Sequence, residues 1–377
     1  MDATSSALKA SGQGGEDVEH LDVLVVGAGL SGVGAGHYLR STCPWARVAI
    51  LEARACIGGT WDIFRFPGIR SDSDMYTLSY SFRPWEGERT IADGTSILRY
   101  IEDTARDEGI EGWIRFRHRV TRAEWSSSEA RWHVTAQRDD GEIVHFTAAF
   151  LFACAGYYRY DRGYLPEFRG SEQFGGRIVH PQFWPDDLDY AGKRVVVIGS
   201  GATAVTMVPA MAQTAAHVTM VQRSPSYVAS MPASSPFARL VRRFLPGPTG
   251  GRAIRWMMAG LTQALYRMCR RWPDRSKHLL IEGVRRRLPD GFDVATHFTP
   301  RYDPWDQRLC LVPDGDLFAA ISEGRVSVVT DGIHAFTSDG LLLESGRELA
   351  ADVIVTATGL ELQFAGGIEF SVDGTPV

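Results

Sequence analysis

Two stretches of the chain have glycine spacings that suit the binding of phosphate groups. The first, Gly27-Ala28-Gly29-Leu30-Ser31-Gly32, follows the apolar run from Leu21 to Val26 and precedes a helix-like segment. A second predicted strand, Arg47 to Leu51, ends at Glu52. The glycines permit a tight turn and close approach of a pyrophosphate, the helix N-terminus offers free N–H groups, and Glu52 can accept hydrogen bonds from ribose hydroxyls. The pattern predicts a βαβ dinucleotide-binding unit.

A second unit repeats this layout further along the chain. It consists of a predicted strand (Val195 to Ile198), the turn Gly199-Ser200-Gly201-Ala202-Thr203-Ala204 followed by Val205, a helix through Met211 and a strand (Val218 to Val221). Here Arg223, followed by Ser224, is expected at the place that Glu52 has in the first unit. A guanidinium pairs with a phosphate, so the second unit favours NADPH over NADH. A surface arginine after a core strand is the alternative interpretation.

The chain thus contains one unit whose second strand is followed by an acid and one whose second strand is followed by an arginine. Together the two units predict two bound dinucleotides. The economical pair is FAD and NADPH, because a nicotinamide donates hydride and a flavin accepts it. The expected fold class is α/β, with two Rossmann-like dinucleotide-binding domains and a helical insertion in the NADP domain.

Composition limits the other classes of protein. The chain has 377 residues, of which 44% are apolar and 23% charged, as in an ordinary globular protein of two or three domains. A formal net charge of -5 argues against a nucleic-acid partner. Five scattered cysteines without a C-x-x-C pair predict no metal site and fit a reducing compartment. Residues 1–15 have the composition of a disordered tail and lack a secretory signal, which favours a cytoplasmic protein.

Further motifs make the sequence resemble a known family. Gly58 to Trp61 and Arg65 to Asp72 follow the first unit, and Phe174 to Pro185 fits F-x-G-x-x-x-H-x-x-x-W-P, the fingerprint of Baeyer-Villiger monooxygenases. Related flavin monooxygenases and N-hydroxylases usually end that motif with an aromatic and a basic residue. Together with Thr299 to Arg308, the run His180 to Ala210 is most similar to the bacterial, mycobacterial-type ethionamide-activating branch of these class B flavoprotein monooxygenases.

The resemblance implies an FAD-containing, NADPH-dependent enzyme that inserts one atom of O2 into ketones through a C4a-peroxyflavin, giving esters or lactones, and that also oxygenates thioethers. Arg308 matches an arginine over the flavin that stabilises the peroxide anion, and Asp72 matches an acid beside the flavin that would orient this arginine. His180 is interpreted as a structural or cofactor-loop residue. Positions that match FAD contacts are Ser31, Glu52, Thr60, Trp61, Asp62, Ile63 and Val120, the last at the adenine; positions that match NADP contacts are Arg70, Ser71, Asp72, Gly199 to Val205, Arg223 and Ser224.

Some of these residues also have structural interpretations. Trp61 could belong to the core, Asp72 could be a turn or helix-cap residue, and Arg308 could be a surface cation.

The motifs also divide the chain. Residues 16–157 are expected to form the first part of the FAD domain, and 158–308 the NADP domain. A return to the FAD domain is expected over 309–377. Within the NADP domain, a helical insertion is expected over about residues 235–290. From residue 236 to residue 290 the sequence contains 12 Arg and one Lys but only three acidic residues. A solvated cap over the substrate site is the first interpretation of this insertion, and contact with an anionic membrane is the second.

Relatives in the family usually continue for roughly a hundred residues beyond the Ala-Thr-Gly segment at 357–359, so the chain is expected to be a fragment or a truncated protein. Two other functions therefore stay open beside the leading one. They are an N- or S-oxygenating flavin monooxygenase and a non-catalytic nucleotide-binding remnant. The sequence predicts neither the physiological substrate nor the oligomeric state.

Overall fold

The computed structural model describes residues 18–377, so the expected tail over 1–15 and the expected start of the first domain lie outside the described residues. The chain divides into two compact units. Unit 1 contains the residues up to Ile57, Ala105–Gly156 and Phe364–Val377, whereas unit 2 contains Gly58–Thr104 and Tyr157–Gln363. Each unit holds one of the two glycine-rich turns.

The last boundary differs from the one expected from sequence. The return to the first domain was expected at residue 309, but residues 309–363 belong to unit 2, and the chain returns only at Phe364. The reason is strand pairing: β13 (Val326–Thr330) pairs with β10 (His217–Gln222), and β17 (Val353–Thr356) pairs with β9 (Arg194–Ile198). Gly58–Thr104, expected in the first domain, is also part of unit 2.

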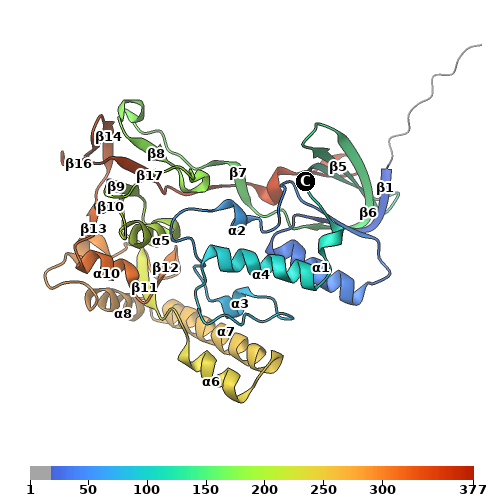
Figure 1. Cartoon of the computed structure of the whole chain (residues 1–377), viewed down its shortest axis with the longest axis horizontal. Coiled ribbons are helices and arrows are strands. Elements are labelled where there is room, and N and C mark those ends of the chain that lie inside the picture. The colour runs from blue at the N-terminus through green and yellow to red at the C-terminus, as the bar shows by residue number, and fades with distance from the viewer. Residues whose placement is uncertain (1–17) are drawn as a thin grey trace, which may run out of the picture. The chain divides into compact units, whose positions relative to one another are not determined.

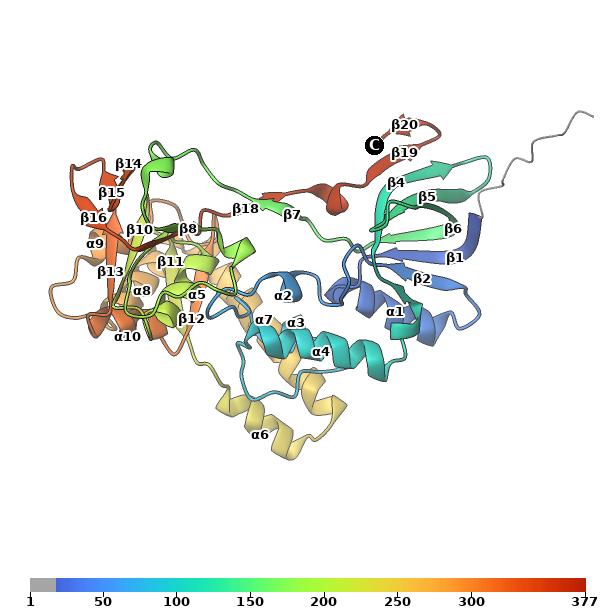
Figure 2. The same cartoon turned by 45° about the horizontal axis from the view of Figure 1, so that its top comes forward.

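Unit 1 is built on an eight-stranded sheet in the order β20-β19-β4-β5-β6-β1-β2-β3 (Figures 1 and 2). The strand β1 (Val18–Val26) runs parallel to both neighbours, β2 (Val48–Leu51) and β6 (Ile143–Ala153). Because it is central, residues Val23 to Val26 are buried on both faces of the sheet, which explains why they are all apolar. The remaining elements are α1 (Leu30–Thr42), η1 (Glu111–Trp113), β3 (Ile114–Arg115), β4 (His118–Ser126), β5 (Arg131–Arg138), η4 (Phe364–Gly367), β19 (Glu369–Val372) and β20 (Thr375–Pro376), and α4 (Gly94–Asp107) contains the division between the units.

Unit 2 is built on a parallel sheet in the order β13-β10-β9-β17-β8, where β8 is Arg177–Val179. The helix α5 (Ala202–Met211) is almost entirely buried, consistent with its uniformly apolar sequence. Its residues Val205, Met207, Val208 and Met211 join the main hydrophobic cluster of the unit. The sheet and α5 therefore form the second Rossmann-like unit.

Smaller elements surround this sheet. Two further helices, α6 (Pro236–Phe244) and α7 (Pro248–Arg271), are followed by α8 (Pro273–Arg285), so the expected insertion folds as three helices. The others are α2 (Thr60–Ile63), α3 (Met75–Leu78), β7 (Tyr158–Gly163), η2 (Ser171–Gln173), η3 (Pro181–Phe183), β11 (Tyr227–Met231), α9 (Val294–His297), β12 (Leu309–Pro313), α10 (Asp316–Ser322), β14 (Ile333–Thr337), β15 (Gly340–Leu343), β16 (Glu348–Ala350) and β18 (Leu360–Leu362).

Candidate functional site

The first glycine-rich turn lies between β1 and α1 in unit 1. Gly27 has a φ of 102°, which disfavours any side chain, and a Cβ there would lie 2.4 Å from the carbonyl oxygen of Cys154. A Cβ on Gly32 would lie only 1.8 Å from the oxygen of Gly27. Gly29 is the N-cap of α1 and makes no side-chain capping bond, so the first amides of the helix point out uncapped. This geometry fits a pyrophosphate, as expected for FAD.

The acid after the second strand holds the same turn together. Glu52 is only 6% exposed, and its two carboxylate oxygens accept hydrogen bonds from the backbone N–H groups of Ala28 (2.8 Å) and Arg54 (2.9 Å). The carboxylate is thereby fixed in direction, and its remaining lone pairs suit ribose hydroxyls. Ser31 is exposed at the start of α1. Val120 is buried in β4 immediately before a β-bulge.

The second turn, in unit 2, follows the same plan with one difference. Gly199 has a φ of 137°, and a Cβ there would lie 2.3 Å from the oxygen of Ala357. Gly201 is the N-cap of α5, again without a side-chain bond. Where unit 1 has Gly32, unit 2 has Ala204, fully buried. At this position α5 therefore accommodates a Cβ, whereas α1 has no room for one.

Strand register corrects the expected alignment of the two units. The amide of Gly27 donates to Leu51 O, and the amide of Gly199 donates to Val221 O. The residue that corresponds to Glu52 is therefore Gln222, which is 3% exposed and donates to His297 O and Thr330 Oγ1. The sequence prediction placed Arg223 at the position of Glu52 by counting residues. This count was wrong because the segment that joins the turn to the second strand is shorter through α5 than through α1.

Arg223 lies in the turn after β10. Its side chain is exposed, and within residues 18–377 it has no ion pair or hydrogen bond. The hydroxyl of Ser200 lies 3.2 Å from the carbonyl oxygen of Ser224 and 3.1 Å from the Ser226 hydroxyl, which ties this loop to the glycine turn. The loop therefore presents a free cation beside the turn, a chemistry that fits the 2'-phosphate of NADPH.

Arg308 lies against the same turn. A Cβ on Gly201 would lie 2.3 Å from Nη1 of Arg308, so the guanidinium is in contact with the glycine. The hydroxyl of Tyr302 donates to the carbonyl oxygen of Arg308 (2.9 Å), and the hydroxyl of Tyr227 donates to the carbonyl oxygen of Tyr302 (2.7 Å). Sequence reasoning missed this pair of tyrosines, although Tyr302 belongs to the quoted run that ends at Arg308.

Asp72 comes close to the same region from a distant part of the chain. Burial raises the pKa of the Cys310 thiol to about 11, while the positive charge of Arg308 lowers it and the negative charge of Asp72 raises it. Burial also raises the pKa of Tyr158, with a smaller contribution from Asp72. The two candidate catalytic residues thus both act on Cys310. The N-cap of α3 is Asp74, which accepts from Thr77 N, so the capping role considered for Asp72 belongs to its neighbour.

The segment from Thr60 to Ile63 forms the single turn α2 in unit 2. Trp61 is partly exposed and is therefore not a fully buried core residue. Asp62 is 7% exposed, and its carboxylate accepts from Arg65 (3.1 Å). In the loop that follows, the Ser71 hydroxyl accepts from Ala92 N. A Cβ on Gly68 would meet Thr206 O at 2.8 Å, so this loop lies directly on α5.

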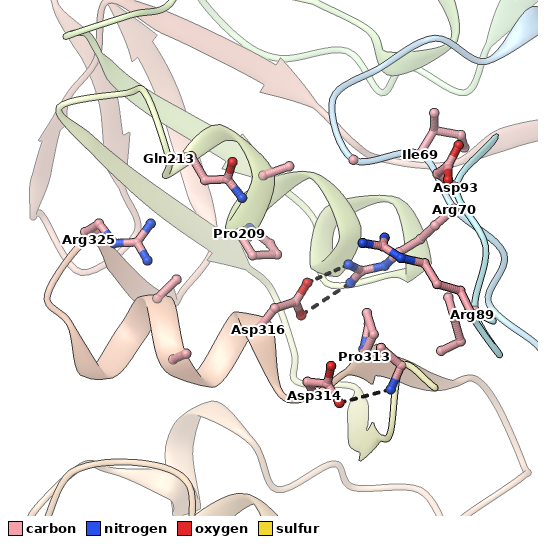
Figure 3. Close-up of a pocket in the computed structure, with 16 residues that line it drawn as sticks. Ile69, Arg70, Arg89, Asp93, Pro209, Gln213, Pro313, Asp314, Asp316 and Arg325 are labelled. Atoms are coloured by element: carbon pink, nitrogen blue, oxygen red, sulfur yellow. Dashed lines mark hydrogen bonds and ion pairs between the residues drawn. The ribbon is translucent and has the colours of Figure 1, made fainter. Parts of the chain in front are cut away.

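Arg70 is held in an ion pair inside unit 2. Its guanidinium donates to both carboxylate oxygens of Asp316, at 2.5 and 3.4 Å, and its Nε is buried without a partner (Figure 3). The pair lines a cavity of about 440 Å³ to which Arg89 and Asp314 also contribute. Arg70 was expected to meet the nicotinamide end of NADP; here its charge is already neutralised by α10.

Residues of the fingerprint from Phe174 to Pro185 are held by contacts with other segments of unit 2. Phe174 is 9% exposed, and a Cβ on Gly176 would meet Asp352 O at 2.3 Å. His180 Nδ1 accepts from Gln182 N, so its Nε2 must carry the proton that it donates to Gly359 O (3.1 Å). Burial lowers the pKa of His180. A neutral histidine thus joins the fingerprint to the Ala-Thr-Gly segment, in agreement with the structural interpretation.

The glycine turns, the phosphate-compatible loops and Arg308 define the class of protein as an α/β enzyme that binds two dinucleotides. Residues 25–86 match the NAD(P)-binding Rossmann-like domain, and residues 87–244 match the flavin-binding monooxygenase-like family. The FAD-containing monooxygenase EthA of Mycobacterium tuberculosis is 55% identical over 360 residues, which are 95% of this chain and 73% of the relative. EthA of Mycolicibacterium smegmatis is 51% identical over the same shares. The chain therefore belongs to the FAD-containing monooxygenases.

Solved structures agree with this assignment. An oxidised steroid monooxygenase bound to NADP superposes with a TM-score of 0.76 at 27% identity, covering 93% of this chain and 73% of that one. A cyclohexanone monooxygenase bound to ε-caprolactone has a TM-score of 0.75 at 21% identity, covering 94% and 76%, and shares the fold. The protein is an NADPH-dependent flavin monooxygenase whose cofactors are FAD and NADPH and whose substrates are O2 and a small molecule.

Proposed function

We propose that the chain inserts oxygen into ketones to give esters or lactones, and that it also oxygenates thioethers. The observation that carries the proposal is the position of Arg308, whose guanidinium contacts Gly201 and acts electrostatically on the same thiol as Asp72. When bound, FAD supplies the reduction and activation of O2. A fixed guanidinium stabilises the negative charge that develops on oxygen when a carbonyl is attacked.

The surroundings of Arg308 support this role. Tyr302 fixes its backbone, while the side chain itself is exposed and forms no ion pair within residues 18–377. Asp72 acts electrostatically on the same Cys310 thiol as Arg308, and we assign it the role of orienting the guanidinium. Gly201, lacking a side chain, leaves room for the guanidinium at the N-terminus of α5.

The test separates reduction from oxygenation. Arg308→Ala should still be reduced by NADPH under anaerobic conditions, but ester formation from a cyclic ketone should fall by about a hundredfold to a thousandfold, with O2 consumption diverted to hydrogen peroxide. Stopped-flow flavin absorbance and product chromatography measure the two steps. Arg301→Ala, an exposed arginine of the same loop, is the matched control and should behave as wild type. Ester formation at the wild-type rate in Arg308→Ala would refute the role of Arg308.

A second comparison distinguishes the substrate classes. The enzyme is offered a cyclic ketone and a thioether at equal concentrations, and the products are identified. Formation of ester and sulfoxide supports the proposal, whereas sulfoxide alone would make the chain an S-oxygenating flavin monooxygenase.

We also propose that the enzyme works in contact with a membrane surface through its basic insertion. In residues 236–290, 13 basic residues (12 Arg and one Lys) stand against three acids. Among the residues that the structure describes, no helix is long and apolar enough to span a bilayer, so the contact would be peripheral.

A further inference from the structure

The helix α6 has its large apolar side chains on the outside. A helix that packs on a protein normally turns its apolar stripe inward. In α6, Phe237, Leu240 and Phe244 follow one another at intervals of three and four residues, and they are 51%, 52% and 72% exposed. The inward side carries Ala238 and Arg242 instead. The outward stripe is therefore a surface without a partner in unit 2.

The helix α7 also exposes large apolar side chains. Trp256 is 75% exposed, and every residue from Gly260 to Arg267 is exposed although α7 is 24 residues long. Leu261 and Leu265 in this stretch are 58% and 37% exposed. Figures 1 and 2 both draw α6 at the lower edge of unit 2, next to α7. Leu261 and Leu265, five and nine residues after Trp256, lie on another side of α7, so we call Phe237, Leu240, Phe244, Leu245 and Trp256 the outward face.

The charges around the outward face have one sign. Residues 236–271 contain eight arginines and no Asp or Glu. Three of these arginines are engaged: Arg242 and Arg255 donate to backbone carbonyls of residues 76–86, and Arg270 pairs with Asp306. The side chains of Arg239, Arg243, Arg252 and Arg267 have no acidic partner within residues 18–377.

Other side chains of α7 contact segments near the candidate site. Arg255 donates to Ser79 O (2.6 Å), in the segment that follows Asp72. Arg270 pairs with Asp306, and Tyr266 packs edge-on against Trp305 with ring centroids 5.9 Å apart. Asp306 and Trp305 lie two and three residues before Arg308. Arg270 and Tyr266 thus join α7, which carries Trp256, to the loop that carries Arg308.

We propose that the outward face docks onto an anionic phospholipid bilayer, with its aromatic and leucine side chains in the interface and the free arginines on the headgroups. Exposed apolar stripes flanked by arginine are typical of helices that lie in the membrane interface, and tryptophan favours that depth. Anionic lipid headgroups complement the uncompensated positive charge. Resting on the proposed function, the inference further assigns the substrate to the apolar carbonyl or thioether compounds that dissolve in such a bilayer.

Binding is tested on the whole chain by co-sedimentation with vesicles, without any measurement of activity. Vesicles of phosphatidylcholine and phosphatidylglycerol at three to one should retain the protein, and pure phosphatidylcholine should not. Raising the salt concentration should release it, because screening weakens the attraction of arginine to the headgroups. Equal binding to both vesicle types, or to neither, would overturn the proposal.

Matched variants locate the contact. Trp256→Ser should weaken vesicle binding about tenfold. Trp45→Ser is the control, because Trp45 is 74% exposed in unit 1, almost the same as Trp256. The double variant Arg243→Gln/Arg252→Gln should weaken binding about tenfold to thirtyfold, whereas Arg169→Gln, another exposed arginine, should leave it unchanged. Equal effects of the two tryptophan variants on vesicle binding would refute the assigned face. The proposal would also be refuted if the wild-type protein did not bind vesicles but formed a dimer that Trp256→Ser abolished.

The substrate assignment has its own readout. Trp256→Ser should raise the KM for a long-chain ketone dissolved in anionic vesicles while leaving the KM for a short water-soluble ketone unchanged. An unchanged KM for both ketones, with vesicle binding lost, would overturn the substrate assignment. A protein that binds vesicles but oxygenates neither ketone would refute the proposed function and leave the docking surface standing.

Discussion

The turns after β1 and β9 have the same glycine spacing but different chemical surroundings. The first is closed by the Glu52 carboxylate, which accepts the amide of Ala28. The second has the buried amide Gln222 at the corresponding place and is flanked by two cations, Arg223 and Arg308. The difference shows how one backbone motif can serve two nucleotides, since an acid suits ribose hydroxyls and arginine suits an additional phosphate.

The helix that follows each turn also differs at one position. Gly32 lets α1 come within contact distance of the oxygen of Gly27, whereas the corresponding residue of α5 is Ala204, which carries a methyl group. The variants below test whether these differences have the consequences that we assign to them.

The largest effect is expected when the small residue of the first turn is enlarged. Gly32→Ala would place a Cβ 1.8 Å from a backbone oxygen that cannot move away, so the free energy of unfolding should fall by about 3 kcal/mol and FAD content should drop. The reciprocal Ala204→Gly should cost only about 1 kcal/mol, the usual difference between alanine and glycine in a helix. Urea unfolding and the flavin-to-protein ratio measure both. Similar losses in the two variants would remove the proposed difference between the turns.

The next prediction concerns the cation after β10. Arg223→Ala should reduce the preference for NADPH over NADH by a factor corresponding to about 1.5–3 kcal/mol, the usual contribution of a hydrogen bond to a charged group. The ratio of kcat/KM for the two cofactors is the measurement. Arg169→Ala serves as a control because Arg169 is an exposed arginine away from the turn. An unchanged ratio in Arg223→Ala would remove Arg223 from the cofactor site.

A smaller effect should separate the two N-cap glycines. In Gly201→Ala the new methyl meets the flexible end of Arg308, which can shift, so the chain should fold and keep its flavin while NADPH binds about tenfold more weakly. Gly29→Ala should do the reverse, lowering flavin content and sparing NADPH. Flavin absorbance and NADPH titration decide the matter. Loss of flavin in Gly201→Ala would exchange the cofactors assigned to the two turns.

The smallest effect is expected at the start of β17, where Asp352 joins the start of β9. Hydrogen bonds from the guanidinium and the backbone N–H of Arg194 hold the pKa of Asp352 down at about 2. A lowered pKa means stability that is present above the unfolded pKa, about 4, and is lost as the pH falls toward 2. Because both side chains are substantially exposed, Asp352→Asn should cost less than about 1 kcal/mol at pH 7.

Thermal unfolding of wild type and Asp352→Asn between pH 2 and 7 checks the sign of this effect. The two curves should converge at the acid end. A gap that widens toward acid would contradict the pKa given for Asp352.

Much of the two βαβ units could be predicted because their signals are local. The expected strand over 195–198 matches β9 to within one residue, and the expected helix ends at Met211 as α5 does, although α5 begins at Ala202, inside the expected turn. The expected alignment of Arg223 with Glu52 was wrong by one residue, because register depends on how the helix crosses back to the sheet. No local sequence pattern predicts the ion pair between Arg70 and Asp316, because the two residues are 246 positions apart in the chain.

The sequence by itself determined the class of protein, the two glycine turns and the residues able to bind phosphate, because these depend on residue types at short, fixed spacing. Only the tertiary structure decided that Gln222 corresponds to Glu52, that Arg308 lies against Gly201, and that the segment before Phe364 completes the second sheet. It also decided that α6 turns its apolar stripe outward. The physical reason is that contacts between distant segments arise from packing and strand pairing, which the order of residues along the chain does not specify.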